Sequence, residues 1–493
     1  MRRLAMSRFA VPGVVLVALV VLFLVAWATQ PGTTRAAAQG SQSAAVTSIT
    51  RSCPPAAPGS AAPQISMIAL PPAAGSASAA HGTATFSPVL ATPPAAGGKA
   101  STKTKTVKPV AVTAPGTVAT VTAPGGGGAA VTATGRMAEG FEAEQTDGSG
   151  TGLVTCTHPG SDMWFVGTGQ SAGASQIVLY LMNTGNITAS ADLTIITDTG
   201  QQDGLSSAIT IAPNQFVAEN IAPYVRGSLA VALHVQTNTG QVAASVWEGG
   251  SSGGAWLPQA AAPATSLVIP GLTVASSAAK LFVVVPGASD AQLRVEAYTP
   301  AGATNQFPGA PVDASAGAAT PVALTSLGAS AAGLKLSSST PVVAGVLVPG
   351  AGIGSFTAAV PPITQQGVVA GNPASRGVTV GLLLTAPGAA ARASISVVSA
   401  DGTVTTPAGD QSVTVAAAHT LAVAVPRPAQ GGHQPFAIVL KPQPGSGPLY
   451  AVRVVTSGSG GLSAPLSSLL PVTSALTSIA LPPAQNSYTA VLP

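Results

Sequence analysis

A turn, an alternating strand and a second turn that ends in glycine recur about every hundred residues along this chain. The three clearest copies are residues 183–200, 286–302 and 387–402, and their starts lie 103 and then 101 residues apart. A second matched segment closes each unit, beginning near residues 132, 237, 337 and 450. Such a repeat predicts tandem copies of one small structural unit.

The middle copy shows the alternation most clearly. Leu293, Val295 and Ala297 fall on one face, whereas Gln292, Arg294, Glu296 and Tyr298 fall on the other. A period of two predicts a β-strand with one buried and one solvated face.

Units of this length, with short strands between Gly, Pro, Asn or Asp turns, are typical of β-sandwiches. The chain is therefore predicted to be all-β, with tandem immunoglobulin-like β-sandwiches; small β-barrels are the alternative. The expected units are 46–152, with a disordered insertion near 88–128, then 153–262, 263–365 and 374–493.

Charged side chains make up only 7% of the 493 residues, against about 25% in an average soluble protein. General acid–base catalysis needs positioned titratable groups, and metal sites need clustered ligands. The five histidines are His81, His158, His234, His419 and His433, and they show no metal-ligand spacing. We therefore expect no enzyme activity, no metal and no cofactor.

The N-terminus carries Arg2, Arg3 and Arg8, followed by an uncharged apolar stretch from Phe9 to Ala28. Twenty such residues are long enough to cross a bilayer, and the preceding arginines favour a cytoplasmic terminus at 1–8. We expect a single membrane anchor, a flexible stalk at 29–45 and an extracytoplasmic remainder. A long signal peptide, cleaved near 26–28 or 36–38, is the alternative and would give a secreted protein.

Cys53 and Cys156 are the only cysteines. Export to an oxidising compartment would allow them to form a disulfide, and two free thiols are the alternative. The predicted bond ties the start of the first unit to the start of the second.

Basic residues give little reason to expect nucleic-acid binding. Without the three N-terminal arginines the chain carries 16 basic and 15 acidic residues. The one cluster is interpreted as a solvated linker rather than a binding patch, and it comprises Lys99, Lys103, Lys105 and Lys108.

Two motifs point to catalysis only weakly. Residues 169–173 match the G-x-S-x-G nucleophile elbow at Ser171, but that motif needs a following helix, and residues 176–182 are predicted to form a strand. The acidic cluster of Glu139, Glu142 and Glu144 is interpreted as a solvated strand edge rather than a catalytic pair.

Aromatic side chains are the best candidates for a ligand or partner surface. Trp164, Phe165 and Trp256 lie in or beside the second unit, and a stacked glycan is one ligand that they could bind. Trp247 is expected in the core of that unit. Asn186 begins an N-glycosylation pattern, but its surroundings suit a hairpin turn.

The stretch CTHPGSDMWFVGTG from Cys156 to Gly169, followed by a strand and the Asn-Thr-Gly turn at 183–185, resembles a family of uncharacterised exported actinobacterial proteins. Cys53-Pro54 is similar to the family's first cysteine. The resemblance implies one N-terminal anchor, tandem β-sandwiches outside the membrane and a role near an envelope glycosyltransferase, with no established activity. We expect a non-enzymatic envelope scaffold; a cell-wall polysaccharide-binding protein and a serine hydrolase are the alternatives.

Overall fold

The structure, a computed structural model, describes residues 10–28, 43–71, 81–92, 111–123, 126–147, 152–202, 208–251, 253–273, 278–324, 327, 331–350, 352–429 and 432–480. Three predicted features lie wholly or largely outside these residues: the cytoplasmic terminus at 1–8, the stalk at 29–45 and the lysine cluster from Lys99 to Lys108.

The N-terminal part contains the helix α1 (Ala10–Ala28). Side chains are described for residues 16–25 of α1, and all of them are exposed. Within the described residues, no helix combines the length and the apolarity that crossing a bilayer requires. A two-stranded sheet joins β1 (Ser43–Ala45) to β37 (Ser478–Ala480).

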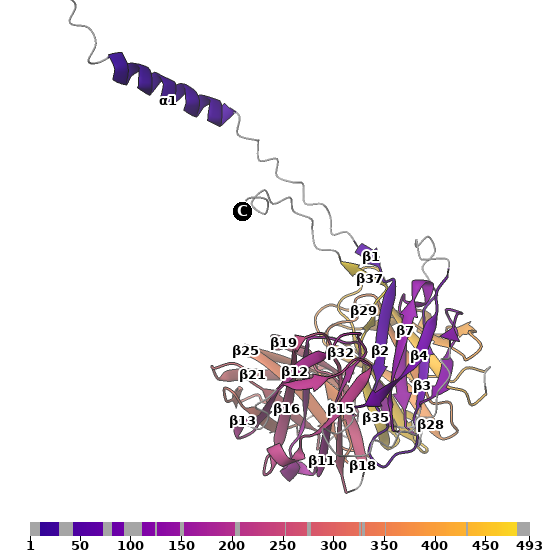
Figure 1. Cartoon of the computed structure of the whole chain (residues 1–493). Coiled ribbons are helices and arrows are strands. Elements are labelled where there is room, and N and C mark those ends of the chain that lie inside the picture. Colours follow the sequence, from indigo (N-terminus) through magenta and orange to yellow (C-terminus); the bar gives the residue numbers. More distant parts are fainter. Residues whose placement is uncertain are drawn as a thin grey trace, which may run out of the picture. The chain divides into compact units, whose positions relative to one another are not determined.

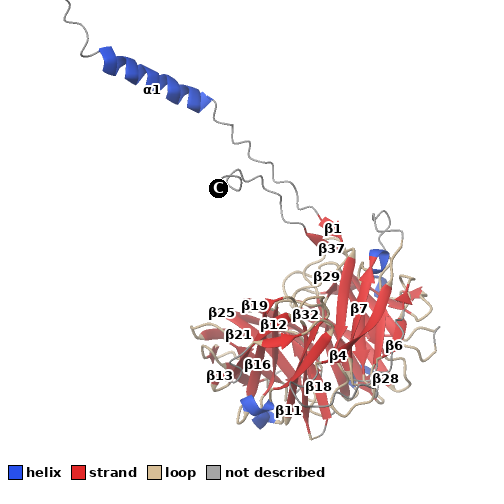
Figure 2. Ribbon diagram, viewed as in Figure 1, coloured by secondary structure: helices blue, strands red, loops and turns tan. Residues whose placement is uncertain are grey.

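Strands form nearly all of the remaining regular structure (Figure 2). From Ala45 to Ser478 the chain is one compact unit. Within it, four successive stretches repeat the same arrangement of two packed sheets, and we call each stretch a module. The all-β prediction is confirmed.

In module 1 one sheet contains the first, sixth, third and fourth strands, and the other contains the eighth, seventh, second and fifth. Module 2 has the same order when β13 (Gly200–Gln202) and β14 (Ile209–Ile211), which both pair with its third strand, are counted together as the fourth. In module 1 the first sheet contains β2 (Ser48–Cys53), β7 (Gly128–Thr134), β4 (Ala84–Ala91) and β5 (Ala111–Val112). The second sheet contains β9 (Leu153–Thr155), β8 (Glu142–Thr146), β3 (Gln64–Ile68) and β6 (Ala119–Thr122). The sheets of module 2 are β10 (Asp162–Thr168), β16 (Ala230–Thr239), β12 (Ala189–Thr197), β13 (Gly200–Gln202), β14 (Ile209–Ile211), and β18 (Gly253–Leu257), β17 (Ala243–Gly250), β11 (Gln176–Asn183), β15 (Gln215–Asn220).

Modules 3 and 4 keep this order and the divided fourth strand, with two exceptions. In module 3, β25 (Ala332–Val348) supplies both the sixth and the seventh strand, and in module 4, β36 (Ser474–Ala475) adds a strand beside the first. In module 3 the first sheet contains β19 (Ala264–Leu272), β25 (Ala332–Val348), β21 (Ala291–Thr299), β22 (Gly302–Asn305) and β23 (Val312–Ala314). The second sheet contains β26 (Ser355–Ala358), the other part of β25, β20 (Lys280–Val284) and β24 (Ala319–Ala323). In module 4 the first sheet contains β36 (Ser474–Ala475), β27 (Gln366–Asn372), β33 (Phe436–Pro442), β29 (Ala391–Val398), β30 (Val404–Thr405) and β31 (Val413–Val415). The second sheet contains β35 (Leu466–Val472), β34 (Tyr450–Ser457), β28 (Val378–Ala386) and β32 (His419–Val425). Short 3-10 helices lie in the connections: η1 (Gly135–Met137), η2 (Gln170–Ala172), η3 (Ala222–Val225), η4 (Asp410–Ser412) and η5 (Gly461–Ser463).

This strand order departs from the predicted immunoglobulin-like sandwich. In the immunoglobulin order the first strand joins the second and fifth, and the last joins the third and sixth. Here the pairs of second with fifth and third with sixth are kept, but the two outer strands have exchanged sheets. The first strand, such as β10, pairs with the sixth, and the seventh, such as β17, pairs with the second.

The three predicted turn–strand–turn segments are confirmed as the third strand of modules 2, 3 and 4. Each is followed by a glycine in the left-handed region: Gly200 at φ 109°, Gly302 at φ 114° and Gly402 at φ 87°. Glycine adopts this conformation without a steric penalty. The hydroxyls of Thr197 and Thr299 donate to the carbonyl three residues on, each at 3.0 Å, so the turns repeat in detail.

Two local predictions need correction. Part of the insertion expected to be disordered near 88–128 is ordered, because it contains β5, β6 and the end of β4, although 93–110 lie outside the described residues. The connection at Asn186 is not a hairpin turn, since β11 and β12 belong to different sheets.

The modules pack side by side in a closed cycle. Modules 1 and 2 share a parallel strand pair between β4 and β15, and apolar clusters join modules 2 and 3 and modules 3 and 4. A third apolar cluster joins module 4 back to module 1, where Ile68 and Leu70 pack against Val368 and Ala370. In Figure 1 the yellow strands of module 4 accordingly lie beside the purple strands of module 1.

Packing between modules buries one end of the face of β21 that the alternation predicted to be solvated, whereas Gln292 and Arg294 on that face are exposed as predicted. Leu293, Val295 and Ala297 are buried in the core of module 3, as predicted. Tyr298, expected on the solvated face, is only 2% exposed. Its strand β21 lies against β32 of module 4, which covers that side.

Candidate functional site

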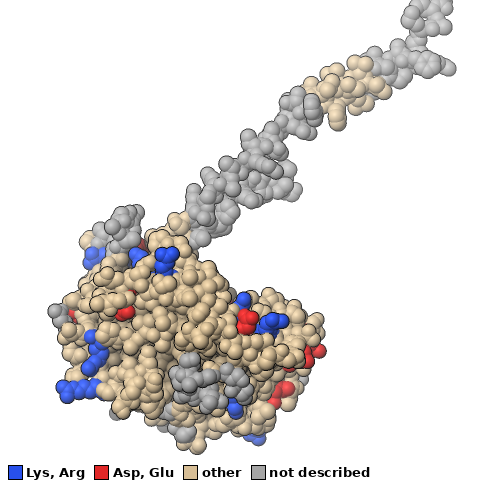
Figure 3. All heavy atoms as spheres, turned by 180° about the vertical axis from the view of Figure 1, so that it is seen from behind, with Lys and Arg blue, Asp and Glu red and all other residues tan. Residues whose placement is uncertain are grey.

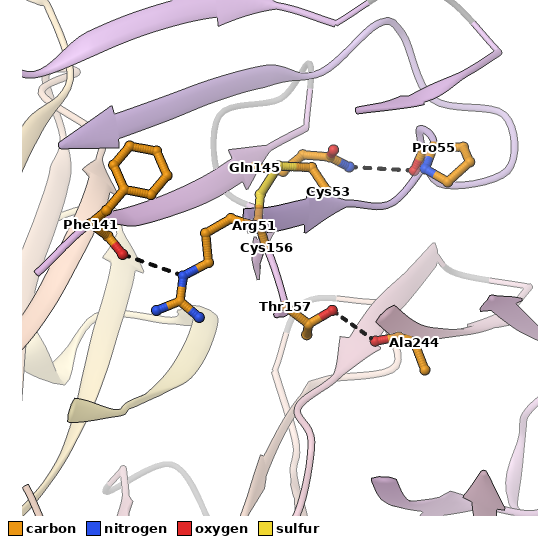
Figure 4. The surroundings of a disulfide bond; sticks show 8 residues. All are labelled: Arg51, Cys53, Pro55, Phe141, Gln145, Cys156, Thr157 and Ala244. Atoms are coloured by element: carbon orange, nitrogen blue, oxygen red, sulfur yellow. Dashed lines mark hydrogen bonds between the residues drawn. A yellow bond between two sulfur atoms is a disulfide. The ribbon is translucent and has the colours of Figure 1, made fainter. Parts of the chain in front are cut away.

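The predicted disulfide is confirmed. Cys53 ends β2, Cys156 follows β9, and the bond between them lies in the core of module 1 (Figure 4). The bond therefore joins the first and last strands of one module. The sequence had instead predicted a link between the first unit and the second. The next residue, Thr157, donates to the Ala244 carbonyl of module 2 at 3.2 Å, so the contact with module 2 begins directly beside it.

The predicted aromatic surface is not exposed. Trp164 is 4% exposed and Phe165 is 1% exposed. Since neighbours on a strand point to opposite sides, the two rings are buried in different surroundings. Phe165 lies in the core of module 2, whereas Trp164 packs against Phe282 and Val284 of module 3. An outward-facing aromatic of one module thus becomes the contact with the next.

The other two tryptophans also lie between modules. Trp247 on β17 and Trp256 on β18 are cross-strand partners, and each is 9% exposed. They pack with Val89 and Ala130 of module 1 rather than in the core of module 2, which corrects the prediction for Trp247. Glycine at 249 and 254 leaves room for the Trp247 indole, since an added Cβ at either position would collide with it.

A cavity of about 600 Å³ lies where segments of all four modules meet. Trp164, Phe165 and Trp256 all line it, so the structure brings the three candidate residues together at one site. The remaining wall is largely apolar and includes Leu257, Pro258, Ala260, Pro361, Leu470 and Pro471. Such a volume falls within the usual range of ligand pockets, about 300–1,000 Å³.

One buried cation lines this cavity. Arg51 on β2 is 5% exposed, its Nε donates to the Phe141 carbonyl at 3.3 Å (Figure 4), and its Nη2 donates to Glu142 Oε1. Ser245 lines the same cavity, is 2% exposed, and its hydroxyl has no hydrogen-bond partner among the described residues.

A second polar group borders the cavity on the side of module 2. His234 Nε2 and Asp162 Oδ1 lie 3.1 Å apart, and the His234 ring stacks on Trp164 with centroids 3.8 Å apart. Burial lowers the pKa of His234, and the bond to Asp162 partly opposes that effect. His158 also lines the cavity.

The acidic cluster, with Glu142 and Glu144 on β8 and Glu139 just before it, is buried, which contradicts its interpretation as a solvated edge. Glu139, Glu142 and Glu144 are 5%, 3% and 3% exposed. Glu142 pairs with Arg51 within module 1, and Glu144 Oε2 accepts from Arg453 Nη1 of module 4 at 2.7 Å. One sequence signal was available for Arg453, which stands as a lone charge in the largely apolar strand β34, whereas Arg51 lies among the polar residues of β2.

Burial also changes the acidity of two carboxyls. It raises the pKa of Glu142 to about 7, with Arg51 acting against this and the Glu144 charge adding to it. Burial raises the pKa of Glu248 well above its usual value, and only the backbone N–H of Thr168 opposes the shift. Both groups lie in protein contacts and not on an open surface.

The arrangement around Ser171 does not form a nucleophile elbow. Ser171 is exposed on η2, and the strand β11 follows instead of a helix. Within the described ranges, no group of three or more His, Cys, Asp or Glu side chains is placed to hold a metal ion.

Comparisons with known proteins place the chain without giving it an activity. No curated protein and no solved structure matches it. One family does match, over residues 107–426, which is about two thirds of the chain. The chain belongs to the protein family described as a family of unknown function, DUF5719.

Proposed function

We propose that this protein is a non-enzymatic scaffold or accessory protein of the cell envelope. The observation that carries the proposal is the closed cycle of four modules within the one compact unit Ala45–Ser478. Modules that contact one another around a cycle keep their outer faces in fixed positions. A body of this kind is suited to holding partners in a defined arrangement.

An extracytoplasmic position fits the chemistry of the chain. The Cys53–Cys156 disulfide is the kind of bond that persists in oxidising compartments. The uncharged segment from Phe9 to Ala28, preceded by three arginines, supports a membrane anchor with the modules outside. We include this anchor in the proposal.

The surface supports association rather than catalysis. On the face seen in Figure 3, charged side chains are few and are separated by wide areas of other residues. The acidic side chains Glu142 and Glu144 are already bound to arginines inside the protein. A neutral surface is compatible with contact to a membrane protein, such as an envelope glycosyltransferase, or to wall polymer.

The test is purification of the tagged full-length protein from native membranes, followed by mass spectrometry. A matched control retains residues 1–45 and lacks the modules. Recovery of a specific membrane protein with the full chain, and not with the control, is the expected result. Equal recovery with the control would refute the scaffold, and recovery of wall polysaccharide alone would favour the glycan-binding role instead.

A further inference from the structure

The central cavity has the composition of a site for an amphipathic molecule. About half of its lining residues are alanine, leucine, valine and proline, and Trp164, Phe165 and Trp256 add to the apolar part of the wall. Pro258, Pro361 and Pro471 have no backbone N–H, so these stretches of wall offer few donors. Polar side chains, among them Thr155, Gln259 and Thr473, line other parts of the wall, so the wall is amphipathic with an apolar majority.

Arg51 supplies a fixed positive charge to this wall. Two of its guanidinium nitrogens are used by Phe141 and Glu142, and Nη1 has no hydrogen-bond acceptor among the described residues. Nη1 is also not among the polar atoms that are fully enclosed without a partner. A guanidinium N–H to a carboxylate is among the stronger hydrogen bonds in proteins.

The other charges at the cavity limit what can bind. Glu142 shares the charge of Arg51 from within the protein, and Asp162 lines the cavity with a side chain that is 55% exposed. A second negative charge on a ligand would face Asp162. One negative charge and an apolar body are therefore the best match.

We propose that the central cavity binds a small amphipathic carboxylate, with its carboxylate on Arg51 Nη1 and its apolar body against the alanine, leucine and proline wall. This inference is independent of the proposed scaffold role, since it concerns the occupant of one cavity and not a partner of the assembled modules. Because the wall combines segments of different modules, an occupant that contacts several of them stabilises their arrangement.

The probes are octanoate and 1-octanol, which share an alkyl chain and differ in the anionic head. Binding to the full-length protein is followed by intrinsic tryptophan fluorescence, since Trp164 and Trp256 line the cavity. We expect one octanoate per chain and at least tenfold weaker binding of 1-octanol. Equal affinities, or displacement of octanoate by a neutral oligosaccharide, would overturn the proposal.

Two variants separate the head from the body of the ligand. Arg51→Gln should weaken octanoate at least tenfold and leave 1-octanol unchanged. Ala262→Phe, at an exposed alanine of the cavity wall, should weaken both probes and does not disturb the Arg51–Glu142 pair. Ala422→Phe, at an exposed alanine on β32 outside the cavity wall, is the matched control.

The proposal can still be tested if one variant fails to fold. If Arg51→Gln fails to fold, Arg51→Lys keeps a charge near Glu142, and Ala262→Phe still tests the location. Unchanged octanoate binding in a folded Ala262→Phe variant would exclude this cavity as the site.

Discussion

The ion pair between Glu144 and Arg453 offers the sharpest test of the closed cycle. These residues are 309 positions apart, and they join β8 of module 1 to β34 of module 4. Glu144→Gln keeps the shape and one oxygen, so the Gly371 N–H, at 3.1 Å from Oε2, retains an acceptor. The change therefore removes the negative charge and little else.

The magnitude follows from the burial of the pair. Arg453 is 0% exposed, and its Nε and Nη2 have no partner among the described residues. The side-chain amide oxygen Oδ1 of Asn372 accepts from Nη1 at 3.4 Å, and this oxygen is neutral. Leaving one partner of a buried ion pair uncompensated costs about 3 to 5 kcal/mol, so Glu144→Gln should lower the free energy of unfolding by about that amount.

Urea unfolding, followed by both tryptophan fluorescence and far-UV circular dichroism, measures this loss. The double variant Glu144→Gln/Arg453→Met removes both charges and should recover most of the stability. Arg294→Gln, at an exposed arginine of module 3, is the control and should change the free energy by less than about 0.5 kcal/mol. A loss below about 1 kcal/mol for Glu144→Gln, or no recovery in the double variant, would refute the reasoning.

Three further changes test other parts of the fold. Replacing Cys53 and Cys156 by Ala removes a covalent link across 103 positions and should lower the free energy of unfolding by about 4 to 5 kcal/mol in the chain-entropy model. Urea unfolding with and without reductant measures this loss, and an unchanged midpoint would contradict it. Because the folded pKa of Glu142, about 7, lies above the unfolded value of 4.5, the folded state holds the proton more tightly, and stability should fall as pH rises from about 4.5 to 7. Glu142→Gln should flatten this dependence of stability on pH, and an unaltered dependence would show that Glu142 does not cause it. Glu248→Gln is the comparison, because burial raises the pKa of Glu248 in the same direction. Gly271→Ala places a methyl 2.6 Å from a valine of module 4 and should lower the thermal midpoint measurably, so an unchanged midpoint would argue against this packing between modules 3 and 4.

The strands within each module could be predicted from the sequence because their signals are local. Alternation places Leu293 on the inner face, and glycine at positions such as 302 marks the turn that follows. The disulfide could be predicted because the chain offers a single pair of cysteines. These signals need only neighbouring residues or simple counting.

The site could not be predicted in the same way, because its walls come from residues far apart in the chain. Alternation says which face of a strand is apolar, but it does not say that a second module covers the other face. Trp164 was therefore expected on a surface, whereas it lies between modules 2 and 3. No local pattern links Arg453 to Glu144, since each lies in a different module.

The polar contact between modules 1 and 4 has a physical consequence for a chain built from repeats. Apolar contact is non-directional, so modules with the same strand order and apolar outer faces have little to distinguish one neighbour from another. Of the ion pairs between described residues, Arg453–Glu144 is the one that joins two modules, and both partners are buried. An unpaired buried charge is costly, so this pair penalises any other packing of module 1 against its neighbours. Among the described residues, this pair therefore stands where the choice of neighbour has to be fixed, whereas the buried Arg51–Glu142 pair lies within module 1.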